Sequence, residues 1–162
     1  MMRLVLLRKA AHRLHYRTVF RGLPISIENR RGSRRYWYDP LKDEDGSTKM
    51  RCPYGYIRLT HGADGDHLDC YLGPNKESDS VFIIRQVDPM TGRYDEDKVM
   101  LGFDTELDAQ KAYLAHYDDP AFFGGIMPMT FNEFTRLLDE ERSSARTRLT
   151  FRVTERVRGV RE

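Results

Sequence analysis

The chain has 162 residues and a net charge of +2, with 40% hydrophobic and 32% charged residues, which suits one domain of ordinary size. Its 8 Phe, 9 Tyr and 1 Trp exclude a chain that is disordered throughout, because such a chain has no core for them to fill. No apolar run approaches the length of about 18 residues that a membrane-spanning helix needs. The only cysteines are Cys52 and Cys70, which argues against a secreted disulfide scaffold, and we expect a protein of a reducing cytoplasm.

Basic side chains gather at the two ends of the chain. Residues 1–22 carry six basic and no acidic side chains, and residues 142–162 carry seven arginines against two glutamates. Since the ends hold +6 and +5 of a total of +2, residues 23–141 hold −9. An acidic middle suits divalent cations, whereas basic ends suit nucleic acid or an acidic partner, unless they are simply solvated. We expect a basic N-terminal helical arm (1–22), a folded domain (23–141) and a basic C-terminal arm or strand (142–162).

The first half of the chain predicts mainly strands. Apolar residues at helical spacing, from Leu4 to Leu14, predict one short amphipathic helix over residues 3–15. Alternating or aromatic-rich runs predict strands at residues 25–28, 36–38, 54–60 and 69–72. Residues 39–49 hold a proline, a glycine and several charges, and so they are expected to form a loop.

The second half changes from strands to helices. The run 81–87 is the clearest strand, and a turn at 88–92 returns the chain into a strand at 98–101. Capping boxes at Thr105 and Thr130 predict helices that run to about Tyr117 and to near Ser143, with a loop between them. Strands followed by helices predict an α+β fold, with a small antiparallel sheet or β-barrel and two helices packed against it. Apolar residues alternate with arginines over 148–153, which predicts an extra strand or arm.

The densest chemical motif consists of three carboxylates, Asp64, Asp66 and Asp69, in six residues. Carboxylates so close together repel one another unless solvent separates them or a cation neutralises them, and all-oxygen ligands favour Mg²⁺, Mn²⁺ or Ca²⁺. A calcium EF-hand is excluded because its positions five and twelve are Leu68 and Asn75 here. An Asp-Gly turn with solvated acids and a zinc site that uses His61, His67 and Cys70 stay open as alternatives.

Groups suited to phosphate lie on either side of this motif. Lysine and arginine side chains, further carboxylates and tyrosine hydroxyls all occur near the expected strands, namely Glu28, Arg35, Tyr54, Glu96, Lys98 and Tyr117. That mixture is typical of phosphoryl transfer to water, in which metal ions clamp the attacking and leaving oxygens. No Gly-rich Walker loop is present, which argues against a nucleotide held by a P-loop.

These motifs together resemble a known family. The run Asp64–Cys70 is similar to the Asp-x-Asp-Pro-x-Asp-x motif of the soluble family I inorganic pyrophosphatases, and the Tyr-Gly-Tyr-Ile run at 54–57 precedes it at a matching separation. The chain most resembles the pyrophosphatase-like domains that bacteriophages and prophages encode. They share Val-Asp-Pro-x-Thr-Gly, Asp-Glu-x-Lys-Val-Met-Leu-Gly-Phe and an Ala-Tyr-Leu helix, so that the resemblance covers about residues 23–140.

The resemblance implies a role for each matching residue. It implies two or more Mg²⁺ or Mn²⁺ ions held by Asp64, Asp66, Asp69, Glu96 and, in a less certain register, Asp88. It implies that Asp66 accepts a proton from the attacking water, near Tyr54, and that diphosphate or a small phosphorylated ligand is bound by Glu28, Arg35, Lys98 and Tyr117. It also implies a host-cytoplasmic or virion-associated protein, which could form homo-oligomers.

Two departures from the family pattern favour a second hypothesis. The family has a phosphate-binding lysine where this chain has Asp118, and an acidic residue where it has Trp37. The alternative is therefore a weak or inactive virion or assembly protein of the same fold, whose basic arms dock neighbouring phage subunits or DNA. A regulatory module that binds a phosphorylated ligand without hydrolysing it is a third possibility.

Overall fold

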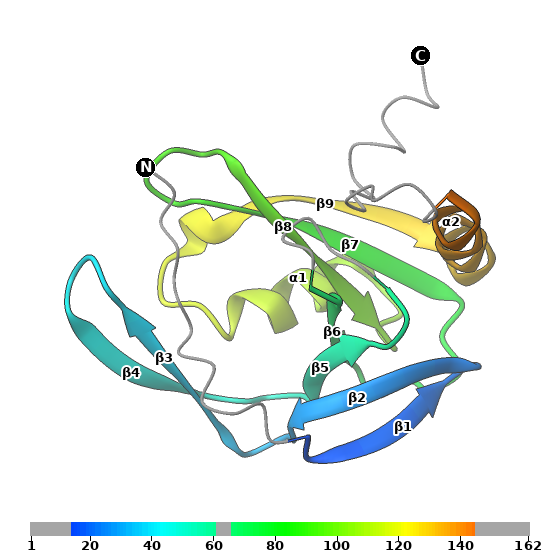
Figure 1. The fold of residues 1–162 in the computed structure, drawn as a ribbon, viewed down its shortest axis with the longest axis horizontal. Coiled ribbons are helices and arrows are strands. Elements are labelled where there is room, and N and C mark those ends of the chain that lie inside the picture. The colour runs from blue at the N-terminus through cyan, green and yellow to red at the C-terminus, as the bar shows by residue number, and fades with distance from the viewer. Residues whose placement is uncertain (1–13, 61–65, 145–162) are drawn as a thin grey trace.

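The computed structural model describes residues 14–60 and 66–144 (Figure 1). Seven of the strands form one sheet in the order β1-β2-β5-β6-β8-β7-β9, in which only the β6–β8 pair is parallel. These strands are β1 (Tyr16–Phe20), β2 (Leu23–Asn29), β5 (Tyr54–Ile57), β6 (Leu68–Leu72), β7 (Ser80–Val87), β8 (Tyr94–Leu101) and β9 (Phe123–Thr130). Strand β8 lies between β6 and β7 in the sheet. It pairs antiparallel with β7, its hairpin partner, and parallel with β6.

The two faces of the sheet carry separate cores, because side chains alternate along each strand. Helix α2 (Phe131–Ser144) covers one face, where Phe134 and Leu138 pack with Ile25, Ile83 and Val99. Helix α1 (Glu106–Leu114) covers the other face, where its Ala109 and Tyr113 pack with side chains of β5 to β8 such as Tyr54, Tyr71, Phe82, Ile84 and Met100. The candidate site lies on the α1 face.

A second, two-stranded sheet projects from the body of the molecule (Figure 1). Strands β3 (Arg34–Asp39) and β4 (Glu44–Lys49) pair in register, with Trp37 opposite Gly46. The prediction of a loop over residues 39–49 is therefore wrong for its second half. A Cβ on Gly46 would lie 2.4 Å from the indole of Trp37, so this glycine, which favoured a loop, instead makes room for the cross-strand aromatic ring.

Both predicted helix starts are confirmed by their capping bonds. The Thr105 hydroxyl accepts a hydrogen bond from the backbone N–H of Asp108 at 3.1 Å. At the second helix the bonds are reciprocal: Thr130 accepts from the N–H of Glu133 at 3.1 Å, and the Glu133 carboxylate accepts from the N–H of Thr130 at 2.7 Å. Helix α1 ends at Leu114, so it stops before Tyr117.

The α+β class is confirmed, but the closed barrel is not. In the described ranges β1 and β9 are the two edges of an open sheet, and the parallel β6–β8 pair makes that sheet mixed rather than antiparallel. A short 3₁₀ turn, Pro120–Phe122, leads into β9, a strand in a region that the sequence predicts as a loop. The predicted helix over 3–15 and the strand over 148–153 lie almost wholly outside the described residues. No helix in the described part of the chain is long and apolar enough to cross a membrane.

Candidate metal and phosphate site

Strand register brings three motif residues together on the α1 face. Tyr54 on β5 pairs with Tyr71, and Asp69 on β6 pairs with Lys98 on β8. Because alternate residues of a strand share a face, the side chains of Tyr54, Asp69 and Lys98 meet although they come from three strands. Gly55 permits this packing, since a Cβ there would lie 1.9 Å from the carbonyl oxygen of Ser26 on β2.

Lys98 is the centre of the site. Its side chain is 1% exposed, and its ammonium lies 2.6 Å from Asp69 Oδ2 and 2.7 Å from Glu96 Oε1. It also donates to the Tyr54 hydroxyl at 3.1 Å, and that hydroxyl in turn donates to Asp69 Oδ2. Within the described residues Asp69 Oδ1 and Glu96 Oε2 accept no hydrogen bond, so each carboxylate keeps one oxygen for a ligand.

One buried cation, Lys98, faces two half-buried carboxylates, and the pKa values of these carboxyl groups diverge as a result. Burial alone would lower the pKa of Lys98, but the attraction of Asp69 and Glu96 raises it well above its usual value. Burial would raise the pKa of Asp69, but the charge and hydrogen bond of Lys98 outweigh it and lower that pKa. Burial raises the pKa of Glu96 to about 7, against the opposing effect of Lys98. Glu96 thus has the higher pKa of the two carboxyl groups.

A second cation comes from the projecting hairpin. The Arg35 guanidinium lies 4.2 Å from the centroid of the Tyr54 ring, which fits a cation–π contact. Burial opposes its charge, but the surrounding tyrosines and Asp69 raise the pKa of Arg35. Trp37 shares the Arg35 face of β3 and lies over Gly46. Strand β3 therefore adds one arginine and one indole to this side of the molecule.

Tyrosine rings form the wall between the cations and α1. The ring of Tyr71 is 4.8 Å from that of Tyr54 and 5.0 Å from that of His116, and the rings of Tyr113 and Tyr117 are 4.5 Å apart. Tyr117 follows α1 and is close enough to Arg35 to act on its pKa, so it belongs to the same site. His116 is buried and hydrogen-bonded through both ring nitrogens, to the N–H of Arg51 and the carbonyl of Ala112.

Two residues of the site were missed by sequence reasoning. Gln86 on β7 donates from Nε2 to Asp95 Oδ2 at 2.9 Å and to Glu96 Oε1 at 3.1 Å. Its amide oxygen accepts from the Tyr113 hydroxyl at 2.9 Å. The available signals were an amide at the end of a mainly apolar strand and a tyrosine four residues before Tyr117 on a predicted helix.

The other candidate residues lie apart from this cluster or outside the described ranges. Asp66 is exposed immediately before β6, and Glu28 is half-buried at an irregularity between β2 and β5. Asp88 lies at the β7–β8 turn, where its carboxylate accepts from the N–H groups of Met90 and Thr91 at 2.7 and 3.3 Å. Asp64 lies outside the described residues.

The two described residues of the alternative zinc site, Cys70 and His67, lie on different sides of the sheet. Cys70 is fully buried in the core beneath α2, and burial raises the pKa of its thiol well above the usual value. His67 is exposed, its ring stacks on Tyr56 with centroids 4.7 Å apart, and its Nδ1 lies 2.8 Å from the Thr60 carbonyl. His61 lies outside the described residues, so the two remaining members do not meet.

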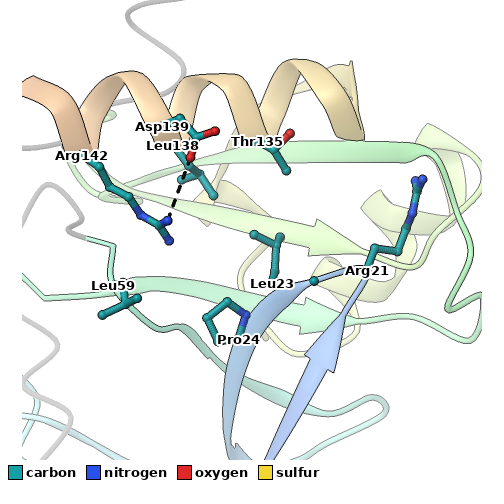
Figure 2. Close-up of a pocket in the computed structure, with 9 residues that line it drawn as sticks. Arg21, Leu23, Pro24, Leu59, Thr135, Leu138, Asp139 and Arg142 are labelled. Atoms are coloured by element: carbon teal, nitrogen blue, oxygen red, sulfur yellow. Dashed lines mark ion pairs between the residues drawn. The ribbon is translucent and has the colours of Figure 1, made fainter.

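A pocket of about 330 Å³ lies on the α2 side (Figure 2), and neither Asp69 nor Glu96 lines it. Leu23, Pro24, Leu59 and Leu138 line it, and Arg142 and Asp139 stand 4.0 Å apart at its wall. None of the candidate residues lines this pocket, and so we place the chemistry at Lys98 instead.

The carboxylate oxygens beside Lys98 are of the ligand type that a hard divalent cation takes. Asp69 and Glu96 each retain a carboxylate oxygen, and oxygen ligands are what Mg²⁺ and Mn²⁺ prefer. In the described part of the chain no three His, Cys, Asp or Glu side chains form a complete metal cluster. Asp69 and Glu96 are therefore too few for a metal site on their own, and no third such ligand lies beside them in the part of the chain that the structure describes.

Comparison with known proteins agrees with the motifs and their geometry. A model of the inorganic pyrophosphatase family matches residues 9–139, which span most of the chain. No significant match is found among curated proteins or solved structures. The chain therefore belongs to the inorganic pyrophosphatase family.

Proposed function

We propose that the chain is a divalent-metal-dependent phosphohydrolase that cleaves diphosphate or a related phosphoanhydride. The observation that carries the proposal is Lys98, a fully buried ammonium held between Asp69 and Glu96. A buried ion pair is a poor source of stability, whereas a lysine between carboxylates suits a site that binds both metal ions and phosphate.

In this proposal the metal ligands are Asp64, Asp66, Asp69 and Glu96, with Mg²⁺ or Mn²⁺ as the ion. Bound ions would neutralise the phosphate oxygens and favour ionisation of the attacking water. Asp88 is a weaker ligand candidate, because its carboxylate is engaged by the turn. Glu28 stays a candidate for the edge of the substrate site.

The protein side chains would hold the diphosphate and move the proton. Arg35 and Lys98 supply positive charge, and Tyr117 supplies a hydroxyl on the same side of the molecule. Asp66 accepts the proton as the water oxygen bonds to one phosphorus atom. The bridging P–O bond breaks, and its electron pair leaves with the second phosphate.

Phosphate release from diphosphate tests the proposal. The purified chain should release phosphate with Mg²⁺, and Asp66→Asn should abolish that release while leaving the thermal stability unchanged, because Asp66 is exposed. Asp79→Asn, an exposed carboxylate away from the site, is the matched control. Absence of release with Mg²⁺, Mn²⁺, Zn²⁺ and Co²⁺ alike would refute the proposed hydrolysis.

The alternative, a phage virion or assembly protein, is favoured by Asp118, an exposed carboxylate immediately after Tyr117. A negative charge there would oppose a tetra-anionic substrate. Deletion of residues 142–162 separates the two functions. An enzyme keeps its turnover without this segment, whereas a docking protein no longer joins particles or DNA.

A further inference from the structure

Gln86 occupies an unusual position for an amide. It lies on β7 between Arg85 and Val87, is 6% exposed, and pairs in register with Glu96. A buried amide needs hydrogen bonds for both its N–H groups and its oxygen, because a buried polar atom without a partner destabilises the fold. Gln86 makes all of these bonds to side chains that surround the proposed metal site.

An irregularity in the strand pairing lets one nitrogen reach two carboxylates. Gln86 pairs with Glu96, but the next residue, Val87, pairs with Tyr94, so that Asp95 is the extra residue. In a regular strand the side chains of Asp95 and Glu96 would point to opposite faces. Here both accept from Gln86 Nε2, at 2.9 and 3.1 Å.

Tyr113 sets the orientation of the amide. Its hydroxyl on α1 donates to Gln86 Oε1 at 2.9 Å. In the flipped orientation the amide oxygen would face two carboxylates, which would repel it. Tyr113 and the two acids thus select the same orientation, and α1 is linked to the carboxylates of β8 through one amide.

The two oxygens of the Glu96 carboxylate therefore differ in their contacts. Oε1 accepts from Gln86 at 3.1 Å and from Lys98 at 2.7 Å. Oε2 accepts no hydrogen bond from the described residues. With Oε1 held by Gln86 and Lys98, the rotation of the Glu96 carboxylate is restricted, and Oε2 is the oxygen that stays without a donor among the described residues.

We infer that Gln86, held by Tyr113, is the positioning residue that presents Glu96 Oε2 to the divalent ion. This inference rests on the proposed function, since it assigns the support of the metal site used there. Hydrogen-bond partners behind a metal ligand contribute about 10- to 100-fold to metal affinity. Loss of Gln86 should therefore weaken ion binding while leaving diphosphate binding by Arg35 and Lys98 nearly intact.

A double-mutant cycle on the full chain tests the inference, with Mn²⁺ binding measured by electron paramagnetic resonance in the absence of diphosphate. Gln86→Met should raise the dissociation constant about 10-fold or more. Tyr113→Phe should raise it less, and the double variant should be no worse than Gln86→Met, because Tyr113 acts through Gln86. Gln110→Met, on the half-buried side of α1, is the matched control and should bind Mn²⁺ like the parent.

Hydrolysis assays on the same proteins give the second readout. For Gln86→Met, saturating Mg²⁺ should restore most of the turnover, and the KM for diphosphate should change less than twofold. Additive effects of the two substitutions, or Mn²⁺ affinity unchanged in Gln86→Met, would overturn the inference. So would a parent chain that binds no Mn²⁺. If Gln86→Met does not fold, Tyr113→Phe alone tests the inference. An unchanged Mn²⁺ affinity in Tyr113→Phe would then refute the role of the Tyr113–Gln86 hydrogen bond.

The two proposals fail separately. A parent that binds Mn²⁺ through Gln86-supported Glu96 but releases no phosphate would retain this inference and lose the hydrolytic function. A parent that hydrolyses diphosphate, but whose Mn²⁺ affinity does not change in Gln86→Met, would retain the hydrolytic function and lose this inference.

Discussion

Replacement of Lys98 by methionine should destabilise the protein in a way that depends on pH. The substitution keeps the length of the side chain but removes the cation that lies 2.6 Å from Asp69 and 2.7 Å from Glu96. Loss of one partner from a buried ion pair costs about 3–5 kcal/mol. Asp69 keeps the Tyr54 hydroxyl and Glu96 keeps Gln86, so we expect the lower end, about 3 kcal/mol at pH 8 without metal ions.

Acidification should reduce this deficit. Without Lys98 the pKa of each carboxyl group in the folded state rises above its value in the unfolded state, and the pKa of Glu96 is already about 7. The folded variant then binds more protons than the unfolded chain, so its relative stability increases as the pH falls from 8 to 6. In the parent, Lys98 lowers the pKa of both carboxyl groups. Acidification therefore stabilises the parent less than the variant.

Urea denaturation at pH 8 and pH 6, with metal ions removed by chelation, measures both effects. Lys76→Met, at an exposed lysine, should change the free energy of unfolding by no more than about 0.5 kcal/mol. A deficit for Lys98→Met below about 1 kcal/mol at pH 8, or one that grows on acidification, contradicts the ion-pair reasoning.

Three further substitutions or conditions test other parts of the structure. Tyr71→Phe should stabilise the protein by about 1 kcal/mol in thermal denaturation, because the buried Tyr71 hydroxyl has no hydrogen-bond partner among the described residues. Gly55→Ala should cost more than about 3 kcal/mol, since its Cβ would collide with the backbone of Ser26; soluble expression with an unchanged melting temperature would refute this. His116, whose pKa is lowered by burial although its bond to Ala112 opposes this, should make the protein less stable as the pH falls below 6.5. In that range the unfolded chain takes up the proton first, so His116→Gln should flatten the pH dependence measured by urea denaturation.

The motifs and the family resemblance single out Tyr54, Asp69 and Lys98 as candidates, and strand alternation explains why they share a face in the structure. Tyr54 and Asp69 fall on predicted neighbouring strands, and Lys98 falls on a strand that follows a recognisable turn. Alternation fixes the face of each side chain once the strands are paired. The pairing itself, with β8 inserted beside β6, depends on which edges meet in three dimensions.

The support behind the site was missed because it depends on irregular pairing and on packing. The extra residue at Asp95 breaks the period-two pattern, so alternation assigns Asp95 and Glu96 to opposite faces. Tyr113 on a helix is equally consistent with simple core packing. Only the placement of α1 against β7 shows that its hydroxyl meets Gln86.

Strands β1, β4 and β9 were missed by sequence reasoning. The last two contain residues that normally end strands, whereas β1 lies in the segment expected to be a helical arm. Strand β9 contains two glycines and Pro128, yet it lies at the edge of the sheet, where proline removes no essential hydrogen bond. A Cβ on Gly124 would lie 2.4 Å from Val87, so this glycine is required by close packing rather than by a turn. The same holds for Gly46 in β4.

The insertion of β8 between β6 and β7 has a consequence for how the protein folds. The β7–β8 hairpin is local in sequence and can form early, whereas Asp69 and Lys98 become neighbours only when that hairpin docks on β6. Under the proposed function, divalent ions held by Asp69 and Glu96 would stabilise only the docked state, and they would slow unfolding more than they accelerate folding. Folding and unfolding rates measured with and without Mg²⁺ would therefore show whether the parallel β6–β8 pair forms late in folding.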